Sequence, residues 1–359
     1  MPSYRWDPVC PPPPPLVRPV RLDPAGTSGP TRGQSHGRRW RRTSYGFYVP
    51  ASVTDDLPEQ RVMEQSVRLP AGGAVTGWAA CRMHRAAFFD GVRPDGYTRI
   101  PVPLALGTRA VIRVDGSVTV SRDRLEPTEV AVLRGVPCTV PDRALFDEMR
   151  HARDVREAVV AMDMMAAAEL TSIARMFDYV ATRAGWNGVP QVRAALALAD
   201  EDSRSPNETR MRLVWQLDAG LPRPLVNRAV FDLRGRLLGY ADLLDVEAGV
   251  VGEYDGADHR SARQHSADVD REARLRAVGL EVFRVTGPDL RDPDKVVRRM
   301  RSARSRAAWL PARRRRWTLE PPRGWLGGTT LRDRTDHRDW LRELDRAWVA
   351  PDIAEIIGL

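Results

Sequence analysis

The pattern of hydrophobic and polar positions divides the chain into segments with different predicted structures. Residues 1–30 are rich in proline and glycine, and the five consecutive prolines at 11–15 favour polyproline II and exclude a helix or a central strand. Between residues 57 and 200, some segments repeat apolar residues at helical spacing, and others are dominated by β-branched residues. The predicted helices of this region span 57–69, 73–89, 141–152, 155–170 and 172–185, and the predicted strands lie within 109–114, 117–121 and 129–140.

Residues 201–308 have the most regular pattern. Ser205 as N-cap, Pro206 at the first helical position and Glu208 three residues after the cap begin a helix, and Gly220 ends it. Gly and Pro turns then separate strands from two further helices. The predicted strands are two within 224–245, joined by a turn, and one each at 249–255 and 280–286, and the predicted helices span 265–279 and 292–307. The order is therefore α-β-β-β-α-β-α.

These patterns predict a protein of the α/β (α+β) class with several domains. A chain of 359 residues, 42% hydrophobic and 29% charged, is long enough to form two or three domains with real cores. The predicted organisation is a disordered proline-rich leader at 1–30, a basic winged-helix-like segment at 31–56, a mixed α/β region at 57–200, an α-β-β-β-α-β domain at 201–308 and an Arg/Trp-rich extension at 309–359.

Two acidic residues interrupt the apolar strand at 249–255. Alternation along the strand sends Val251, Glu253 and Asp255 to one face. Asp242, near the end of the preceding strand, joins them if the two strands pair with that face aligned. Converging carboxylates repel one another, and a hard cation with oxygen ligands makes such a cluster tolerable. We therefore predict that the three acids bind Mg²⁺ or Mn²⁺, which would activate a water for attack on a phosphodiester.

Four further residues fit this site. Glu208 would reach the outer shell of the metal or orient a water, and His259 would act as an acid or base near neutral pH. Asp268 and Arg271 share one helix face with Leu275, so that Arg271 would hold a phosphate or pin a carboxylate. The alternative interpretation is a set of exposed acids at a strand end and an ordinary salt bridge on a helix.

Charge and cysteine content narrow the class of protein. The net charge of +9 suits a polyanionic partner, although all the basic residues except Lys295 are arginines, an imbalance that a GC-rich genome also produces. Three widely separated cysteines without C-x-x-C spacing indicate neither disulfides nor a zinc site. Because the chain has no apolar stretch of about 18 residues and no signal-peptide core, we expect a cytoplasmic protein that does not act at a membrane. We also expect no nucleotide cofactor.

Basic residues gather in two places outside the predicted metal site. In segment 31–50, arginines stand beside Trp40 and Tyr45, which predicts a basic helix followed by a wing that contacts DNA; a solvated basic turn is the alternative. The predicted nucleic-acid-binding residues are Arg38, Arg39, Arg41 and Arg42. Residues 309–359 combine RRRRW at 313–317 with half of the tryptophans, so they either stack on bases or pack on the preceding domain.

The acidic residues of segment 201–308 also resemble those of a known family. The resemblance is to the PD-(D/E)XK restriction-endonuclease-like fold, and within it to the family of unknown function related to very-short-patch-repair endonucleases, which carries the same E-x-D-G-x-x-H block. It is carried by Glu208, Asp242, Glu253, Asp255, Gly256, His259, Asp268 and Arg271. It implies Mg-dependent DNA cleavage with Asp242, Glu253 and Asp255 at the metal and catalytic positions. Asp255 stands where the fold has its lysine, which leaves the water-activating group open.

Residues 31 to about 170 are similar to type IV antitoxins of the abortive-infection class. The similarity is carried by the segment TVPDRALFDEM at 139–149, with Arg143 and Asp147, which matches the family's T-V-x-x-R-x-L-F-D pattern. It implies an N-terminal winged helix-turn-helix, DNA binding, and partnership with a nucleotidyltransferase-like toxin protein.

Two hypotheses of different class follow. In the first, the protein is a metal-dependent DNA endonuclease that acts in phage defence, DNA repair or mobile-element biology, with RNA as the weaker alternative substrate. In the second, it is an antitoxin-like DNA-binding or toxin-neutralising protein whose nuclease fold is vestigial. The intact Asp242, Glu253 and Asp255 favour the first, because a site no longer used would be free to lose an acid cluster that is costly to maintain.

Overall fold

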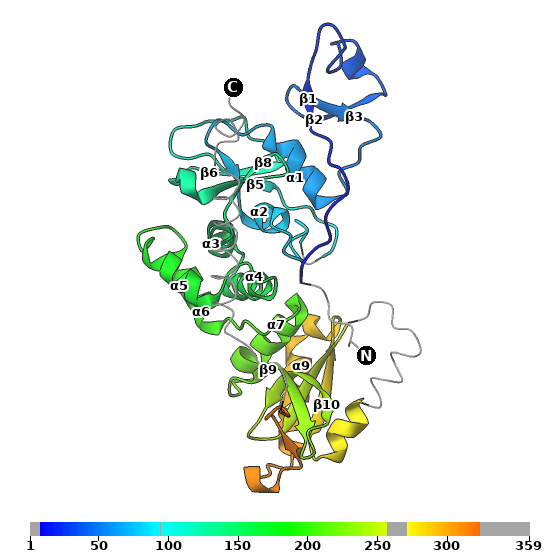
Figure 1. Cartoon of the computed structure of the whole chain (residues 1–359), viewed down its shortest axis with the longest axis vertical. Helices are drawn as coiled ribbons and strands as arrows, with labels where there is room; N and C mark the ends of the chain where they lie inside the picture. Colours follow the sequence, from blue (N-terminus) through cyan, green and yellow to red (C-terminus); the bar gives the residue numbers. More distant parts are fainter. Residues whose placement is uncertain (1–7, 94, 257–270, 324–359) are drawn as a thin grey trace, which may run out of the picture. The chain divides into compact units, whose positions relative to one another are not determined.

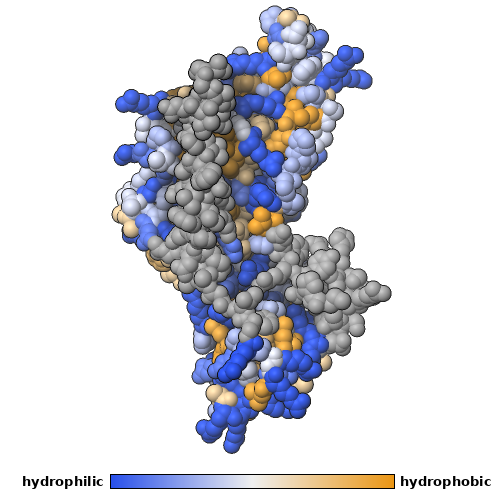
Figure 2. Space-filling model, viewed as in Figure 1, coloured by the Kyte–Doolittle hydropathy of each residue, from blue (hydrophilic) through white to orange (hydrophobic). Residues whose placement is uncertain are grey.

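The computed structural model describes residues 8–93, 95–256 and 271–323, and the mixed α/β class predicted from the sequence is confirmed (Figure 1). Two compact units are present, one formed by 1–170 and 175–197 and the other by 171–174 and 198–359. Within the described ranges, no helix has the length and apolar character needed to cross a membrane. The face shown in Figure 2 is mainly hydrophilic, with hydrophobic residues in separate patches.

A small antiparallel sheet at the start of the first unit contains the basic segment. Its strands, in the order β1-β3-β2, are β1 (Val20–Arg21), β2 (Trp40–Ser44) and β3 (Phe47–Pro50). The predicted basic helix is therefore wrong, and the only helical turn in 31–50 is the 3₁₀ turn η1 (Gln34–His36). The physical reason is local, since Trp, Thr, Phe, Tyr and Val favour strands, and Gly46, at a φ of +77°, makes the hairpin turn.

A second sheet of the first unit is mixed and five-stranded, in the order β6-β5-β4-β8-β7. Its strands are β4 (Ala74–Val75), β5 (Val102–Ala105), β6 (Val118–Ser121), β7 (Val130–Leu133) and β8 (Val136–Thr139). Helices α1 and α2 pack on this sheet, and α3 packs on α2 and α4. The helical elements of this part of the chain are α1 (Pro58–Ser66), α2 (Gly77–Met83), η2 (Pro127–Glu129), α3 (Pro141–His151), α4 (Val155–Ala167), α5 (Ile173–Ala181) and α6 (Val189–Leu198).

Two predictions for this sheet are wrong. The β-branched segment 109–114 is not a strand but part of an exposed loop, in which the side chains of Val111 and Val114 are 76% and 51% exposed. The strand that pairs with β6 is β5, which the sequence interpretation missed because Pro101 and Pro103 interrupt the strand pattern. The helix predicted over 73–89 also begins later, at Gly77, because Ala74 and Val75 pair with β5 as strand β4.

A buried network of charged side chains lies between α3 and the surrounding elements. Arg143 is completely buried, and its guanidinium donates to Asp147 Oδ2 and Glu129 Oε2, both at 2.9 Å. Arg150 donates to Asp147 Oδ1 at 2.9 Å, and Arg183 pairs with Glu129 at 2.6 Å. The segment that resembles the antitoxin family thus supplies the centre of a structural ion-pair network, in which each buried charge has partners of opposite sign.

The second unit is built on a five-stranded sheet in the order β12-β11-β10-β9-β13, in which β11 and β12 are parallel and the other pairs are antiparallel. Its strands are β9 (Leu225–Asp232), β10 (Leu237–Asp245), β11 (Val250–Asp255), β12 (Glu281–Thr286) and β13 (Trp317–Thr318). Its helical elements are α7 (Pro206–Leu213), which continues as the π-helical turn η3 (Val214–Asp218), a helical segment at 271–277, η4 (Asp289–Arg291), α9 (Pro293–Arg306) and η5 (Ala312–Arg314).

Each face of this sheet is covered by helices through its own apolar cluster. On one face, Trp215 of η3 stacks on Phe283 of β12 at a centroid distance of 6.0 Å, and Met300 of α9 joins them. On the other face, Leu275 of the helical segment packs on Val251 of β11, together with Trp317 of β13. The alternation of β11 decides which face each side chain joins, so it also decides where the acidic residues lie.

The buried Arg143 network makes the first unit sensitive to loss of a single charge. We expect Arg143→Met to lower the free energy of unfolding by about 3–5 kcal/mol, because Asp147 and Glu129 each lose a buried partner. Urea denaturation measures the change. The control is Arg153→Met, whose side chain is 68% exposed and pairs with Asp154 at the surface, and its effect should stay within about 0.5 kcal/mol. A loss below about 1 kcal/mol for Arg143→Met would show that Arg150 and Arg183 compensate.

Candidate functional site

The candidate site begins where the ladder between β10 and β11 ends. The last paired residues are Leu243 and Gly252, so the next position along each strand brings Asp242 beside Glu253. Asp242 is oriented by the backbone, because its Oδ2 accepts a hydrogen bond of 2.7 Å from the amide of Tyr254. A side-chain carboxylate thus takes the place of a strand carbonyl at the point where the two strands separate.

Glu253 is the most deeply buried acid of the site, with 3% of its surface exposed. Its Oε2 pairs with Arg271 Nη2 at 3.1 Å and with Arg284 Nε at 3.5 Å. Its other oxygen, Oε1, is buried and accepts no hydrogen bond from any residue that the structure describes. One oxygen of this carboxylate therefore pairs with two arginines, and the other is a buried acceptor whose hydrogen-bonding capacity is unused among the described residues.

Arg284 links the acids of β11 to the neighbouring helix. It stands directly beside Glu253 in the parallel register of β11 and β12, and it also lies 3.9 Å from Asp255 and 2.8 Å from Glu272. Asp255 is half-buried, and this contact holds it near the same guanidinium. The arrangement is a row of carboxylates bridged by one cation.

Arg271 reaches Glu253 by lying across β10 at a glycine. A Cβ atom at Gly239 would stand 2.9 Å from Cδ and 3.0 Å from Cγ of Arg271, closer than real Cβ contacts allow. Because the residue is glycine, the aliphatic stem of Arg271 passes over the strand, and its guanidinium pairs with Glu253. Of the two tasks that the sequence predicted for Arg271, the structure shows the pinning of a carboxylate.

Glu208 caps a helix and contacts the site through its charge. Its Oε1 accepts from Ser205 Oγ at 3.0 Å, while Oε2 accepts from the amide of Arg204 at 3.0 Å and from Asn227 Nδ2 at 2.8 Å. The predicted N-cap of α7 is confirmed, since Ser205 Oγ accepts from the amide of Glu208 at 3.3 Å, while Glu208 itself accepts from the amide of Arg204 and not from that of the N-cap residue. Both oxygens are engaged in these bonds, and the charge of Glu208 still acts on Asp242.

The carboxyls at the centre of the site bind protons more tightly than exposed acids do. Burial raises the pKa of Asp242 well above its ordinary value, and the nearby charges of Glu208 and Glu253 raise it further. Burial also raises the pKa of Glu253, while Arg271 and Arg284 act in the opposite direction. Elevated carboxyl pKa values of this origin are typical of functional sites, because a structure built only for stability would avoid them.

The donor set of the site suits a hard divalent cation. Asp242 and Glu253 bring carboxylate oxygens together, and the unpartnered Oε1 of Glu253 is an acceptor that a cation would satisfy. Within 8–93, 95–256 and 271–323, no three Asp, Glu, His or Cys side chains form a complete metal-binding group. Asp255 is held near Arg284, and the predicted residues His259 and Asp268 lie outside the described part of the chain.

The predicted nucleic-acid-binding arginines differ in their surroundings. Arg41 is bound to the buried Glu64, with Nη2 at 2.5 Å from Oε1, and it also donates to the carbonyl of Val53. Arg41 thus forms a structural ion pair, and its contact with nucleic acid stays a prediction. Arg38 and Arg39 are exposed, and Arg42 lies near the ring of Tyr45 at a distance of 5.4 Å.

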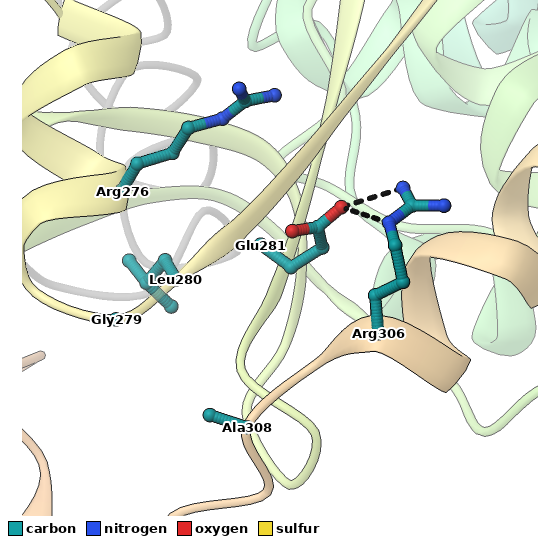
Figure 3. A pocket seen from close by; sticks show the side chains of 6 residues that line it. All are labelled: Arg276, Gly279, Leu280, Glu281, Arg306 and Ala308. Carbon is teal, nitrogen blue, oxygen red and sulfur yellow. Dashed lines mark hydrogen bonds and ion pairs between the residues drawn. The ribbon is translucent and has the colours of Figure 1, made fainter.

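A separate cavity of about 460 Å³ lies at the opposite end of β12 from the acids (Figure 3). Figure 3 shows Glu281 paired with Arg306, at 2.6 Å, while Arg276 lies across the cavity from this pair. Arg276 is itself bonded to Glu272 at 2.9 Å and to the carbonyl of Val282. Each charged group that lines this cavity therefore has a partner of opposite sign, and none of the lining residues belongs to the carboxylate site.

Arg284 and Gly239 are important residues of the site that the sequence interpretation missed. Arg284 is the one charge between Val282 and Val285 of an otherwise apolar buried strand, and that isolation was a usable signal. Gly239 could not be identified from the sequence, because the need for glycine there arises only from the stem of Arg271, which passes over the strand at this residue.

Comparison with known proteins finds no match, since no family model, curated protein or solved structure corresponds significantly to this chain. The class of the site is therefore defined by its geometry alone, as a buried, arginine-bridged carboxylate cluster at the divergence of two antiparallel strands.

Substitution of Gly239 tests the crossing of Arg271. We expect Gly239→Ala to lower the free energy of unfolding by about 1–3 kcal/mol, because the added methyl group displaces the stem of Arg271 and weakens its pairing with Glu253. Thermal or urea denaturation gives the value. The matched control is Gly256→Ala, where the nearest atom of the described residues to the new Cβ would be at 3.7 Å, an ordinary contact. Equal effects of the two substitutions would contradict the proposed crossing.

The pH dependence of stability tests the burial of Asp242. The pKa of Asp242 is raised in the folded state, so between the unfolded-state pKa of about 3.9 and the higher folded-state pKa the folded protein holds a proton that the unfolded chain has lost. The contribution of Asp242 to stability therefore falls as pH rises between these two pKa values. Asp242→Asn removes this titration while keeping an acceptor for the Tyr254 amide. We expect the variant, in EDTA, to equal the wild type below pH 4 and to become more stable than it at pH 7, by about 1.4 kcal/mol per unit of raised pKa. A gain that is independent of pH would contradict the shift.

Proposed function

We propose that this chain is a metal-dependent endonuclease that hydrolyses phosphodiester bonds in DNA. The observation that carries the proposal is the pair Asp242 and Glu253, two carboxyls whose burial raises their pKa, placed together where β10 and β11 diverge, with Glu253 Oε1 lacking a partner among the described residues. A protein gains no stability from such a pair, so its presence is best explained by a bound cation.

Mg²⁺ or Mn²⁺ would be held by Asp242 and Glu253, with Asp255 as the next acid along β11. The bound ion would polarise a phosphoryl oxygen and lower the pKa of a water. Arg271 and Arg284 place two guanidinium groups at the same acids, where they would attract a phosphate group and hold it by paired hydrogen bonds. His259 remains the proposed acid or base, and Asp268 the proposed supporting carboxylate.

The setting of this activity is proposed from the sequence resemblance. The PD-(D/E)XK fold has a helix, three strands, a helix and a strand, and the second unit has α7, β9, β10, β11, the helical segment at 271–277 and β12 in that order. The four acids that carry the resemblance, Glu208, Asp242, Glu253 and Asp255, lie on α7, β10 and β11, which supports the proposal. We propose DNA as the substrate, and phage defence, repair or mobile-element biology as the context.

A second candidate function is supported by a different observation. Arg271 and Arg284 neutralise Glu253 without a metal, so the cluster is stable as a salt-bridge network. That arrangement would suit an antitoxin-like DNA-binding or toxin-neutralising protein with a vestigial nuclease fold. The two candidates differ in one measurable property, which is whether the acids bind a divalent cation.

Metal binding and DNA cleavage measured on the same samples test the proposal. We expect the wild type to bind Mg²⁺ or Mn²⁺ in a calorimetric titration and to nick or cut plasmid DNA, and Asp242→Asn to reduce cleavage by about 100-fold or more while keeping DNA binding, because the substitution removes a ligand charge. Glu253→Ala should lose metal binding. The matched control is Glu247→Gln, an acid that is 74% exposed on the same unit and should cleave normally.

The outcomes separate the two candidates. Metal binding and cleavage that both disappear in the variants support the nuclease. A wild type that binds no divalent cation, or cleavage that is unchanged in Asp242→Asn, rules out the catalytic assignment and leaves the vestigial fold. Linear, mismatched and RNA substrates in the same assay identify the nucleic acid that is cut.

A further inference from the structure

Tyr45, at the tip of the β2–β3 hairpin, presents an aromatic ring to solvent between two arginines. Its side chain is 69% exposed even though the guanidinium carbons of Arg42 and Arg113 lie 5.4 Å and 5.0 Å from the ring centroid. The turn residue Gly46, at a φ of +77°, holds the hairpin so that the ring stands at its end. What distinguishes Tyr45 from other exposed residues is the pair of guanidinium groups beside its ring, because together they form a surface that is both aromatic and cationic.

The second arginine comes from a loop that is fixed in position. Arg113 belongs to the exposed loop at 107–116, whose backbone is bound by Arg68: this side chain donates to the carbonyl of Arg113 and to Ser117 Oγ at 2.9 Å, and pairs with Asp115 at 3.1 Å. These bonds hold the backbone of the loop, from which the guanidinium of Arg113 reaches the ring of Tyr45.

Arg42 and Arg113 are not neutralised by carboxylates within the described structure, although Arg42 Nε donates to the carbonyl of Ser44 at 3.2 Å. Neither forms an ion pair with any acid in 8–93, 95–256 or 271–323, whereas Arg41 on the same strand is bound to Glu64. The segment 31–50 contains five arginines and no acidic residue, so the field around Tyr45 is positive. A ring flanked by unpaired guanidinium groups in a positive field is complementary to a base attached to phosphates.

The geometry points to a binding site for single-stranded DNA on this surface. An unpaired base stacks on Tyr45 in place of one of the two guanidinium groups over the ring, and Arg42 and Arg113 then contact the phosphates on either side. A duplex fits less well, because the faces of its paired bases are covered by their neighbours. The exposed apolar side chains on the loop of Arg113, Val111 and Val114, suit a deoxyribose and a thymine methyl group and offer no hydrogen bond to a 2′-hydroxyl.

This inference does not depend on the nuclease proposal. It concerns residues of the first unit, whereas the carboxylate site belongs entirely to the second. It also replaces the predicted basic helix with a different mode of binding, in which stacking on one ring contributes specificity for unpaired bases and the arginines contribute affinity that depends on salt.

Fluorescence anisotropy of the full chain in EDTA, with a labelled 20-nucleotide oligothymidylate, tests the site without cleavage. We expect Tyr45→Ala to weaken binding about 5- to 100-fold, Tyr45→Phe to bind nearly as well as the wild type, and Arg113→Gln to weaken binding and reduce its salt dependence. The matched control is Tyr97→Ala, since Tyr97 is an exposed tyrosine of the same unit, at 79%, with no arginine stacked on it among the described residues. It should bind normally.

Each outcome decides the proposal. Selective loss with Tyr45→Ala, together with weaker binding of duplex DNA and of oligouridylate, supports it. Equal binding by Tyr45→Ala and Tyr97→Ala overturns it, and so does tighter binding of duplex or of RNA than of oligothymidylate. Because EDTA removes divalent metal, failure here leaves the nuclease assay unaffected, and failure of cleavage leaves this result unaffected.

Discussion

The burial of Glu253 is the constraint on which the second unit depends. The strand that carries it must be apolar enough to lie inside the sheet, and an ionised carboxylate there needs compensating charge. Arg284 supplies it from the parallel strand, and Arg271 supplies it from the facing helical segment by crossing a glycine. The acids, the arginines and the glycine at 239 therefore together neutralise the buried charge of Glu253. The candidate functional site consists of these same residues.

The first unit solves a similar problem in a different way. Its buried Arg143 is surrounded by Asp147 and Glu129, and these acids are shared with Arg150 and Arg183. There the cation lies at the centre and the acids surround it, whereas in the second unit the acids lie at the centre. The difference matters for function, because the acid-centred arrangement leaves a carboxylate oxygen without a partner among the described residues, and a cation can use it.

The two units offer different chemistry for the two proposed activities. The basic hairpin around Tyr45 has positive charge and an exposed ring, which support the proposed binding of nucleic acid, while the second unit has buried acids, which support the proposed hydrolysis. Positive charge alone would not have separated these functions. The partners of each arginine make the distinction: Arg41 is bound to an acid and has a structural role, whereas Arg113 faces solvent and is available to the proposed ligand.

The sequence by itself determined the features that depend on a few neighbouring residues: the caps at Ser205 and Asp292, the turn at Gly235, and the alternation that sets Glu253 on the face of Val251. Tertiary structure decided the rest. It placed β5 rather than 109–114 beside β6, bound Arg41 to Glu64, and brought Arg284 to Glu253. The physical reason is range, because caps and alternation are local hydrogen-bonding and packing rules, whereas strand pairing and the neutralisation of buried charge depend on residues far apart in the chain.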